Sequence, residues 1–277
     1  MKKLLLLSAL LIFACSSSDD GSDSDDNANN PNAQRLVESV LVISANDSAT
    51  FNYWFSYDEN NRLSTMQCQF NDYNEFGQIF DEGIIEVYNI EYSDNAISFG
   101  WNDEEVSSTY LLNNDGTIDA NYITFLNGYL NTIEFGDGQD DNCLQQCTWV
   151  NNNLTQIVET CSPNFSDSDI EEFEYTNHIN PIGYYGWTLT GSGVAAMPYL
   201  VGAMGKPSEL LPNKIRSCRG NTYSPINQNN CNNFSETEIT YEFDSQGYPI
   251  VINENSYWQS VNYERFSSTS YAITYTN

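Results

Sequence analysis

The sequence predicts an all-β fold: an antiparallel β-meander of many hairpins, whose strongly curved sheet approaches an up-and-down barrel, with one long loop or short-helix insertion. Apolar and polar residues alternate along residues 84–92, 239–243 and 271–275, which is the period of half-buried strands. Asn- and Gly-rich turns separate these runs, and no long stretch carries the apolar stripe of a helix.

The expected strands follow from this alternation and from their content of β-branched and aromatic residues. They are 36–44, 50–57, 62–70, 84–92, 95–101, 106–112, 117–126, 129–135, 144–150, 154–160, 169–176, 214–218, 236–243, 248–255, 258–266 and 269–276. Tight turns that tolerate positive φ are expected between several of them, at 60–61, 114–116, 127–128, 151–153 and 245–247.

Four hairpins share one design, in which an aromatic strand is followed by Asn or Asp, a tight turn and an apolar strand. They lie at residues 55–63, 110–118, 124–130 and 241–249. The spacing between them is unequal, so the pattern predicts a meander of similar hairpins and excludes a regular solenoid or propeller.

The first 34 residues are set apart from the folded domain. Lys2 and Lys3 precede a mainly apolar segment of ten residues, too short to span a bilayer, so residues 1–14 are expected to be a signal peptide. Residues 15–34 are rich in Ser and Asp and are expected to be a disordered acidic tether. Residues 35–277 are expected to form a single antiparallel β domain.

The charge balance excludes whole classes of function. The chain has 38 acidic and 9 basic residues and a net charge of −29. Nucleic-acid binding needs clustered Lys and Arg that release counterions from phosphates, so no nucleic-acid partner is expected.

The N-terminal segment resembles two known signals. Residues 11–15 resemble a bacterial lipobox, which implies that Cys15 becomes a diacylglycerol-modified, fatty-acylated (palmitate-type) N-terminus. A plain secretory signal is the alternative. Asp19 and Asp20 resemble the acidic export signal of Bacteroidota surface lipoproteins, which implies an outer-membrane protein facing the cell exterior; an acidic spacer without a sorting role is the alternative.

The domain itself resembles a group of Bacteroidota lipoproteins that are classed as a domain of unknown function with a porin-like fold. The resemblance rests on the hairpins above and on residues 149–154, 175–181 and 205–212, and covers most of residues 36–277. It implies a curved meander approaching a barrel and implies no catalytic residue.

Six cysteines remain after Cys15, an even number that favours disulfides in an exported protein. If residues 151–153 form a three-residue loop, strand register places Cys143 opposite Cys161. Cys218–Cys231 is expected to close the loop between them, and Cys68–Cys147 is left by elimination. Zinc is disfavoured, because the short paired spacings of thiolate ligands are missing.

No cofactor and no metal are expected. Asp137, Asp140 and Asp141 crowd one turn and offer oxygen ligands that suit Ca²⁺, but the turn lacks the distal Glu and the sixth-position Gly of a calcium loop. A solvated acidic turn is the favoured interpretation.

The sequence predicts a protein that is not an enzyme. It has no nucleophile elbow, no metalloprotease helix motif and no phosphate-binding loop, and His178 is the single histidine. Paired carboxylates running glycoside hydrolysis are the alternative.

The segment 183–212 interrupts the alternation and carries Tyr184, Tyr185 and Trp187. Four bases lie in or beside it: Lys206, Lys214, Arg216 and Arg219. One interpretation is a plug or lid with an aromatic core. The other is a ligand or partner site with aromatic platforms and a cationic rim.

Taken together, these features predict a lipid-anchored surface protein that works as a binding or interaction module. The expected partner is a glycan or peptide ligand, or an outer-membrane barrel to which the chain would be an accessory subunit; a structural surface-coat protein is a third alternative. Ser48, in Asp47-Ser48-Ala49, resembles an acceptor site for O-linked glycans.

Overall fold

The computed structural model describes residues 35–44, 49–73, 79–83, 85–102, 108–136, 142–162, 169–183, 201–220, 225–226, 228–260 and 263–276. Within these residues, sixteen strands form one antiparallel sheet and a single 3-10 turn, η5 (Gln228–Asn230), supplies the helical structure. No helix in these ranges is long and apolar enough to cross a membrane. The strands are β1 (Val37–Ser44), β2 (Ala49–Tyr57), β3 (Leu63–Tyr73), β4 (Ile79–Glu82), β5 (Glu86–Ser93), β6 (Ala96–Trp101), β7 (Ser108–Leu111), β8 (Ile123–Leu126), β9 (Tyr129–Gly136), β10 (Asn142–Val150), β11 (Asn153–Ser162), β12 (Asp169–Ile179), β13 (Leu210–Arg219), β14 (Asn233–Phe243), β15 (Pro249–Ser260) and β16 (Tyr263–Tyr275).

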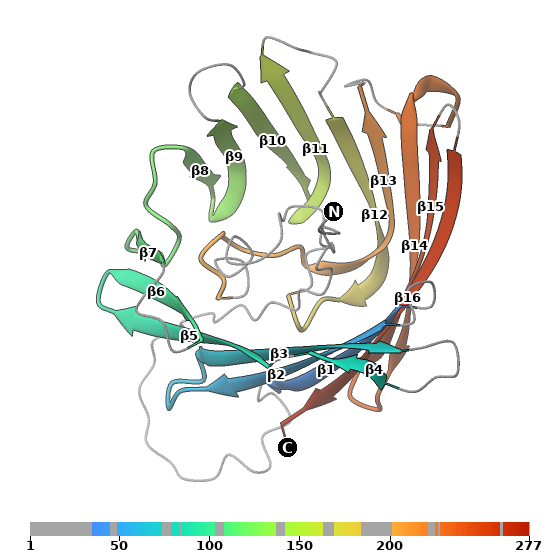
Figure 1. The fold of residues 1–277 in the computed structure, drawn as a ribbon. Helices are drawn as coiled ribbons and strands as arrows, with labels where there is room; N and C mark the ends of the chain where they lie inside the picture. Colours follow the sequence, from blue (N-terminus) through green and yellow to red (C-terminus); the bar gives the residue numbers. More distant parts are fainter. Residues whose placement is uncertain are drawn as a thin grey trace.

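The sheet curls round without closing, which confirms the predicted fold class (Figure 1). The strand order is β7-β6-β5-β3-β2-β1-β16-β15-β14-β13-β12-β11-β10-β9-β8, with β4 paired to β3. The first and last strands therefore pair with each other, and the two edges of the sheet are β7 and β8, which follow one another in the chain. The gap in the curled sheet is therefore bounded by two strands from the middle of the sequence, β7 and β8.

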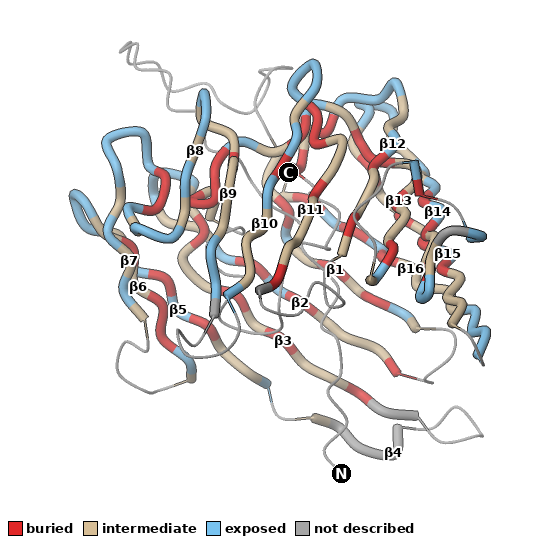
Figure 2. The backbone as a smooth tube through the Cα atoms, turned by 90° about the horizontal axis from the view of Figure 1, so that it is seen from above, coloured by how far each residue is buried: buried red, intermediate tan, exposed pale blue. Residues whose placement is uncertain are grey.

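Burial alternates along the strands, as the sequence predicts (Figure 2). On β2, Tyr53 and Phe55 are buried while Trp54 and Ser56 are exposed. The inward side chains of the strands pack into one core that includes Ile97, Phe99 and Ile252. The curved sheet is thus filled by its own apolar side chains and turns its polar positions outward.

A smaller apolar cluster lies on the outer face. Ile170, Cys218 and Phe234 occupy facing positions on β12, β13 and β14, and Ile226 packs on them. The Cys218–Cys231 disulfide closes the loop that carries Ile226. This loop therefore covers an outer patch that the strands alone would leave in solvent.

The tight turns gather at one end of the sheet, because successive strands run in opposite directions. This tight-turn end holds the turns at 58–62, 94–95, 127–128, 151–152 and 244–248. Asn61, Asn127, Asn151 and Asn152 have positive φ there, as do Gly128 and Gly247. These positions confirm the predicted turns.

Six aromatic side chains form hydrogen bonds between neighbouring strands near the tight-turn end, and two of them, Tyr57 and Tyr241, belong to the repeated hairpins. Near the end of a strand, an aromatic side chain donates to the carbonyl at the start of the neighbouring strand. The pairs are Tyr57 with Val37, Tyr92 with Leu63, Trp149 with Leu130, Tyr175 with Leu154, Tyr241 with Pro212, and Tyr275 with Pro249. Each bond satisfies a carbonyl where a strand begins.

Three strand predictions need correction. Residues 117–122 lie outside a strand, and only Ile123–Leu126 pair with β9. β4 was missed. The C-terminal region forms two long strands where three were expected, because Glu254 and Ser256 point inward and interrupt the apolar pattern without interrupting the ladder. Thr237 and Ser256 bond to each other through their hydroxyl groups, 2.8 Å apart, so these buried polar groups are satisfied.

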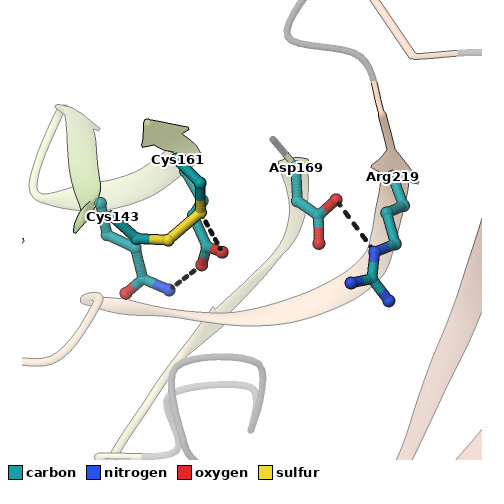
Figure 3. Close-up of a disulfide and its surroundings, with 6 residues drawn as sticks. Cys143, Cys161, Asp169 and Arg219 are labelled. Atoms are coloured by element: carbon teal, nitrogen blue, oxygen red, sulfur yellow. Dashed lines mark hydrogen bonds and ion pairs between the residues drawn. A yellow bond between two sulfur atoms is a disulfide. The ribbon is translucent and has the colours of Figure 1, made fainter. Parts of the chain in front are cut away.

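Two of the three predicted disulfides are formed. Cys143 is bonded to Cys161 across β10 and β11 (Figure 3), and Cys218 is bonded to Cys231. The third pair is not formed: Cys68 on β3 and Cys147 on β10 are buried free thiols. They point into the core from strands that are well separated in the sheet order.

Candidate functional site

A strap, residues 201–209, crosses the tight-turn end of the sheet. The backbone amide of Lys206 donates to the carbonyl of Gly128, 2.8 Å away, and that of Glu209 donates to the carbonyl of Asn152, 3.1 Å away. Ile118, beyond β7, donates to Ala203 at 2.9 Å. The strap therefore joins segments on both sides of the opening between β7 and β8.

The strap is also part of the core. Ala203 and Met204 are buried and pack against the inward side chains of the sheet. The described part of the long insertion thus packs on the core, while the aromatic residues of the plug interpretation lie outside the described residues. It forms turns and no helix.

Gly205 lets the strap approach the 127–128 turn. Its φ is +95°, and a Cβ atom built on it would lie 2.8 Å from the carbonyl oxygen of Gly128. Any other residue at this position would collide with backbone that cannot move aside cheaply.

A groove of about 670 Å³ opens between the strap and the neighbouring turns. Its lining residues come from the 127–129 and 152 turns, from the end of β12 and from the strap. They are Asn127, Tyr129, Asn152, Ile179, Asn180, Lys206, Pro207, Ser208, Glu209 and Leu210.

Lys206 supplies the positive charge of the groove. Its ammonium lies 5.5 Å from the centroid of the Tyr129 ring, and its side-chain carbons pack beside Gly128. Among the described residues Lys206 makes no ion pair within 4.0 Å. Its charge acts at longer range on Asp115, whose pKa is lowered chiefly by a hydrogen bond from Thr117.

Tyr129 is held as a fixed aromatic face. Its ring centroid lies 4.6 Å from that of Trp149, and the Trp149 indole donates to the carbonyl of Leu130 at 2.7 Å. Burial, with a smaller contribution from the charge of Glu209, raises the pKa of Tyr129, so its hydroxyl stays protonated at neutral pH.

Amide groups complete the groove. The Asn152 side chain donates to Glu209 Oε1 at 2.6 Å, and the Asn180 side chain donates to the carbonyl of Ser208 at 3.1 Å. Glu209 is the single carboxylate among the lining residues. The arrangement offers one cation, one aromatic face and several amides to a polar ligand.

The structure separates the four bases that the sequence places together. Lys206 lies in the groove, whereas Lys214 and Arg216 lie on the outer face of β13. Arg216 contacts Glu174 at 2.6 Å and Glu236 at 2.8 Å, and Lys214 contacts Glu238 at 3.1 Å. Arg219 lies near Asp169, at 4.0 Å (Figure 3). The three bases on β13 therefore form ion pairs, and the four bases together build no continuous cationic rim.

The other predicted site residues lie outside the described residues. They are Cys15, Ser48, Asp137, Asp140, Asp141, Tyr184, Tyr185 and Trp187. His178 is described; it is exposed near the end of β12, with its ring 4.4 Å from that of Phe243.

One group of potential metal ligands occurs in the described part of the chain, and it is not a site. Cys143, Glu159 and Cys161 lie within 4.8 Å of one another, but both sulfur atoms are already used by the disulfide. Glu159 instead accepts a hydrogen bond from Gln145 at 2.8 Å.

Sequence reasoning found Lys206 and missed the rest of the groove. Asn127 and Asn152 were predicted only as turn residues. Their positive φ angles fit that role, so nothing in the sequence marked them as groove residues. Tyr129 fits the apolar–polar alternation of an ordinary strand, so the sequence offered no reason to assign it to a site. One signal in the sequence could have located the groove. In an antiparallel meander, alternate turns lie at the same end of the sheet, so several of the predicted turns had to lie close together.

Comparison with known proteins identifies the fold. No protein-family model matches the chain, and no curated protein matches it. Among solved structures, a porin-like protein from Bacteroides uniformis is similar over 87% of this chain and 98% of its own, with a TM-score of 0.52 and 15% identity. A porin-like protein from Bacteroides vulgatus covers the same shares with a TM-score of 0.43 and 12% identity. The similarity shows a porin-like fold.

Proposed function

We propose that this chain is a lipid-anchored outer-membrane protein, exposed at the cell surface, that works as a non-catalytic binding module and holds an acidic glycan in the tight-turn groove. Anchoring and export rest on the lipobox-like residues 11–15 and on Asp19 and Asp20. The porin-like fold is compatible with this location. The binding role rests on the groove.

The single observation that carries the proposal is the environment of Lys206. In a chain with 38 acidic residues, this cation makes no ion pair among the described residues and lies over an aromatic face in a groove. A carboxylate on a sugar would pair with the ammonium, while the sugar ring would stack on Tyr129 and its hydroxyls would bond the amides.

The overall negative charge does not forbid an acidic ligand. At physiological ionic strength, exposed charges are screened beyond about 8 Å. The contacts inside the groove therefore decide affinity, and remote carboxylates mainly slow the encounter.

The non-catalytic role is supported by the number of carboxylates in the groove lining. Glycoside hydrolysis generally needs two Asp or Glu side chains flanking the bond that is cleaved. The groove lining offers Glu209 alone, and this residue accepts a hydrogen bond from Asn152. Release of shortened sugars during incubation with bound oligosaccharides would overturn this part of the proposal and support the hydrolase alternative.

The location is tested with the lipidated protein in its own host. We expect intact mass to show a diacylated Cys15, and externally added protease to remove the protein from whole cells. A Cys15→Ala variant should leave the membrane fraction. Retention of that variant, or protection of the wild type from protease, would contradict the proposed location. A stoichiometric barrel partner in a mild-detergent pull-down would support the accessory-subunit alternative.

The binding role is tested on a glycan array that pairs uronic- and sialic-acid glycans with their neutral parents. We expect signals on acidic members, lost in a Tyr129→Ala variant and kept in Trp54→Ala, an exposed aromatic residue on β2 away from the groove. Equal signals on neutral parents, or equal loss in both variants, would contradict the proposal.

A further inference from the structure

A second groove lies on the outer face of the sheet, on strands β14, β15 and β16. Its volume is about 410 Å³, and its lining residues are Glu236, Glu238, Asn255, Ser256, Tyr257, Phe266, Ser267 and Ser268. It shares no lining residue with the tight-turn groove.

Strand register explains how these side chains meet. Glu236 lies opposite Tyr257, and Tyr257 lies opposite Phe266, which gives one row across three strands. Two residues along, Glu238, Asn255 and Ser268 form the next row. Because alternate residues share a face, both rows point outward and form one surface, the outer-face platform.

The aromatic part of the platform is open to solvent. The Tyr257 and Phe266 ring centroids lie 4.9 Å apart, and Phe266 is 70% exposed. The Tyr257 hydroxyl accepts a hydrogen bond from Gln228 at 3.1 Å, and Gln228 belongs to the loop closed by Cys218–Cys231. The disulfide loop therefore helps to orient Tyr257.

The acidic part of the platform is fixed by ion pairs. Glu236 lies 2.8 Å from Arg216 and 3.5 Å from Lys214, and Glu238 lies 3.1 Å from Lys214. Glu238 nevertheless keeps a side-chain exposure of 62%. Its carboxylate is thus held in place with acceptor sites still open to a ligand.

These two parts together define the ligand. A pair of aromatic rings offers stacking to the C–H face of a sugar ring, and oriented carboxylates and amides accept and donate hydrogen bonds to hydroxyls. Three carboxylates, those of Glu174, Glu236 and Glu238, share two bases here, so an anionic ligand is disfavoured.

We infer that the outer-face platform binds a neutral oligosaccharide. The sugar ring stacks on Phe266 and Tyr257, and its hydroxyl groups bond Glu238 and Asn255. This site is independent of the acidic-glycan site in the tight-turn groove, both in its residues and in the charge that it selects.

The experiment titrates the full mature protein in mild detergent with maltohexaose, cellohexaose, xylohexaose and mannohexaose by calorimetry. We expect at least one of them to bind with a Kd below the millimolar range. Phe266→Ala should weaken that binding at least about fivefold, since aromatic stacking alone carries this order of magnitude. Glu238→Gln, which keeps the side-chain shape, should weaken it as well.

Two controls separate binding at the platform from binding at exposed aromatic residues in general and from binding in the tight-turn groove. Tyr263→Ala removes an aromatic residue of similar exposure on the same strand that does not line the platform, and Lys206→Ala alters only the other groove. Both should bind like the wild type, and the unfolding midpoint of each variant checks that it is folded.

Binding to none of the four oligosaccharides would overturn the inference. Unchanged oligosaccharide binding by a folded Phe266→Ala variant would also overturn it, as would a loss of binding in Tyr263→Ala equal to that in Phe266→Ala. Loss of oligosaccharide binding in Lys206→Ala, with binding retained in Phe266→Ala, would assign neutral sugars to the tight-turn groove. That result would refute the outer-face platform as a site, while a role of the tight-turn groove in binding would stand.

Discussion

The hydroxyl groups of Ser208 and Tyr175 lie 2.9 Å apart and join the strap to the sheet. The Tyr175 hydroxyl donates to the carbonyl of Leu154, so the Ser208 hydroxyl is the donor between the two. Ser208 Oγ also accepts the backbone amide of Leu154 at 3.0 Å. One buried hydroxyl thus ties the strap, β11 and β12 together beside the groove.

Replacing Ser208 by Ala should destabilise the protein. The substitution leaves the buried Leu154 amide without its acceptor, which typically costs about 1–3 kcal/mol. Urea unfolding measures the loss, and Ser93→Ala, at an exposed strand end, should change stability by less than about 0.5 kcal/mol. Equal effects of the two variants would contradict the role of Ser208.

Replacing Gly205 by Ala should damage the groove before it damages the sheet. A Cβ atom would meet the Gly128 carbonyl at 2.8 Å, and the positive φ is strained for alanine, so the strap must move. We expect weaker ligand binding and faster hydrogen exchange at the Lys206 amide, which bonds Gly128. Gly116→Ala, also at positive φ but with open space around it, is the control for backbone strain alone. The idea fails if Lys206 exchange is unchanged in Gly205→Ala.

The pH dependence of stability should reveal the pairing of Arg35 with Asp244. Burial alone would raise the pKa of Asp244, but hydrogen bonds from the Tyr248 and Gln246 amides and the charge of Arg35 outweigh it and lower that pKa below 3.8. A lowered pKa contributes stability above the unfolded value, and this contribution is lost as the pH falls through the folded value.

Arg35→Ala should therefore destabilise the protein more at pH 7 than at acid pH. The expected loss at pH 7 is about 1–2 kcal/mol, from a partly buried ion pair and from the guanidinium lying 4.9 Å from the Tyr275 ring centroid. Below pH 3.8 the difference from wild type should narrow, since the charge attraction to Asp244 is lost while the contacts of Arg35 with Gln246 and with the Tyr248 and Tyr275 rings remain. A difference that grows on acidification would refute this assignment.

The thiol count distinguishes two disulfides from three. Burial raises the pKa of Cys68 to about 11, and burial together with the charge of Glu171 raises that of Cys147 to about 12, so neither thiol should react with a disulfide reagent in the native protein at pH 8. In a Cys15→Ala chain we expect two thiols to react after denaturation without reductant, and six after reduction. No reactive thiol in the denatured, unreduced chain would restore the third disulfide.

The strands and tight turns were predictable because the alternation of apolar and polar residues and the Asn and Gly residues of turns are local features of the sequence. The pairing of Cys143 with Cys161 was obtained from register, but for a different physical reason. The turn has two residues, so Val150 faces Asn153, and a bulge between Leu154 and Gln156 adds the missing residue and restores the expected register. A bulge depends on neighbouring strands and leaves no clear mark in the sequence.

The candidate site was predictable only in part. Lys206 stands out as a base in an acidic chain, but it lies on the strap, whereas Lys214 and Arg216 lie on the outer face of β13. There they face carboxylates of β12 and β14. Such cross-strand partners lie 20 or 42 residues away in the chain. Local patterns therefore suggested a cationic rim where tertiary pairing builds ion pairs.

The most direct test of the central claim is the affinity of the protein for trigalacturonic acid and for its methyl ester, two ligands that differ in charge and little in shape. The tight-turn groove predicts that the acid binds about threefold to tenfold more tightly than the ester. That ratio should fall to near one in Lys206→Gln and persist in Lys206→Arg. Equal affinity of the wild type for both ligands, or a ratio unchanged in Lys206→Gln, would contradict the claim that Lys206 reads an acidic sugar.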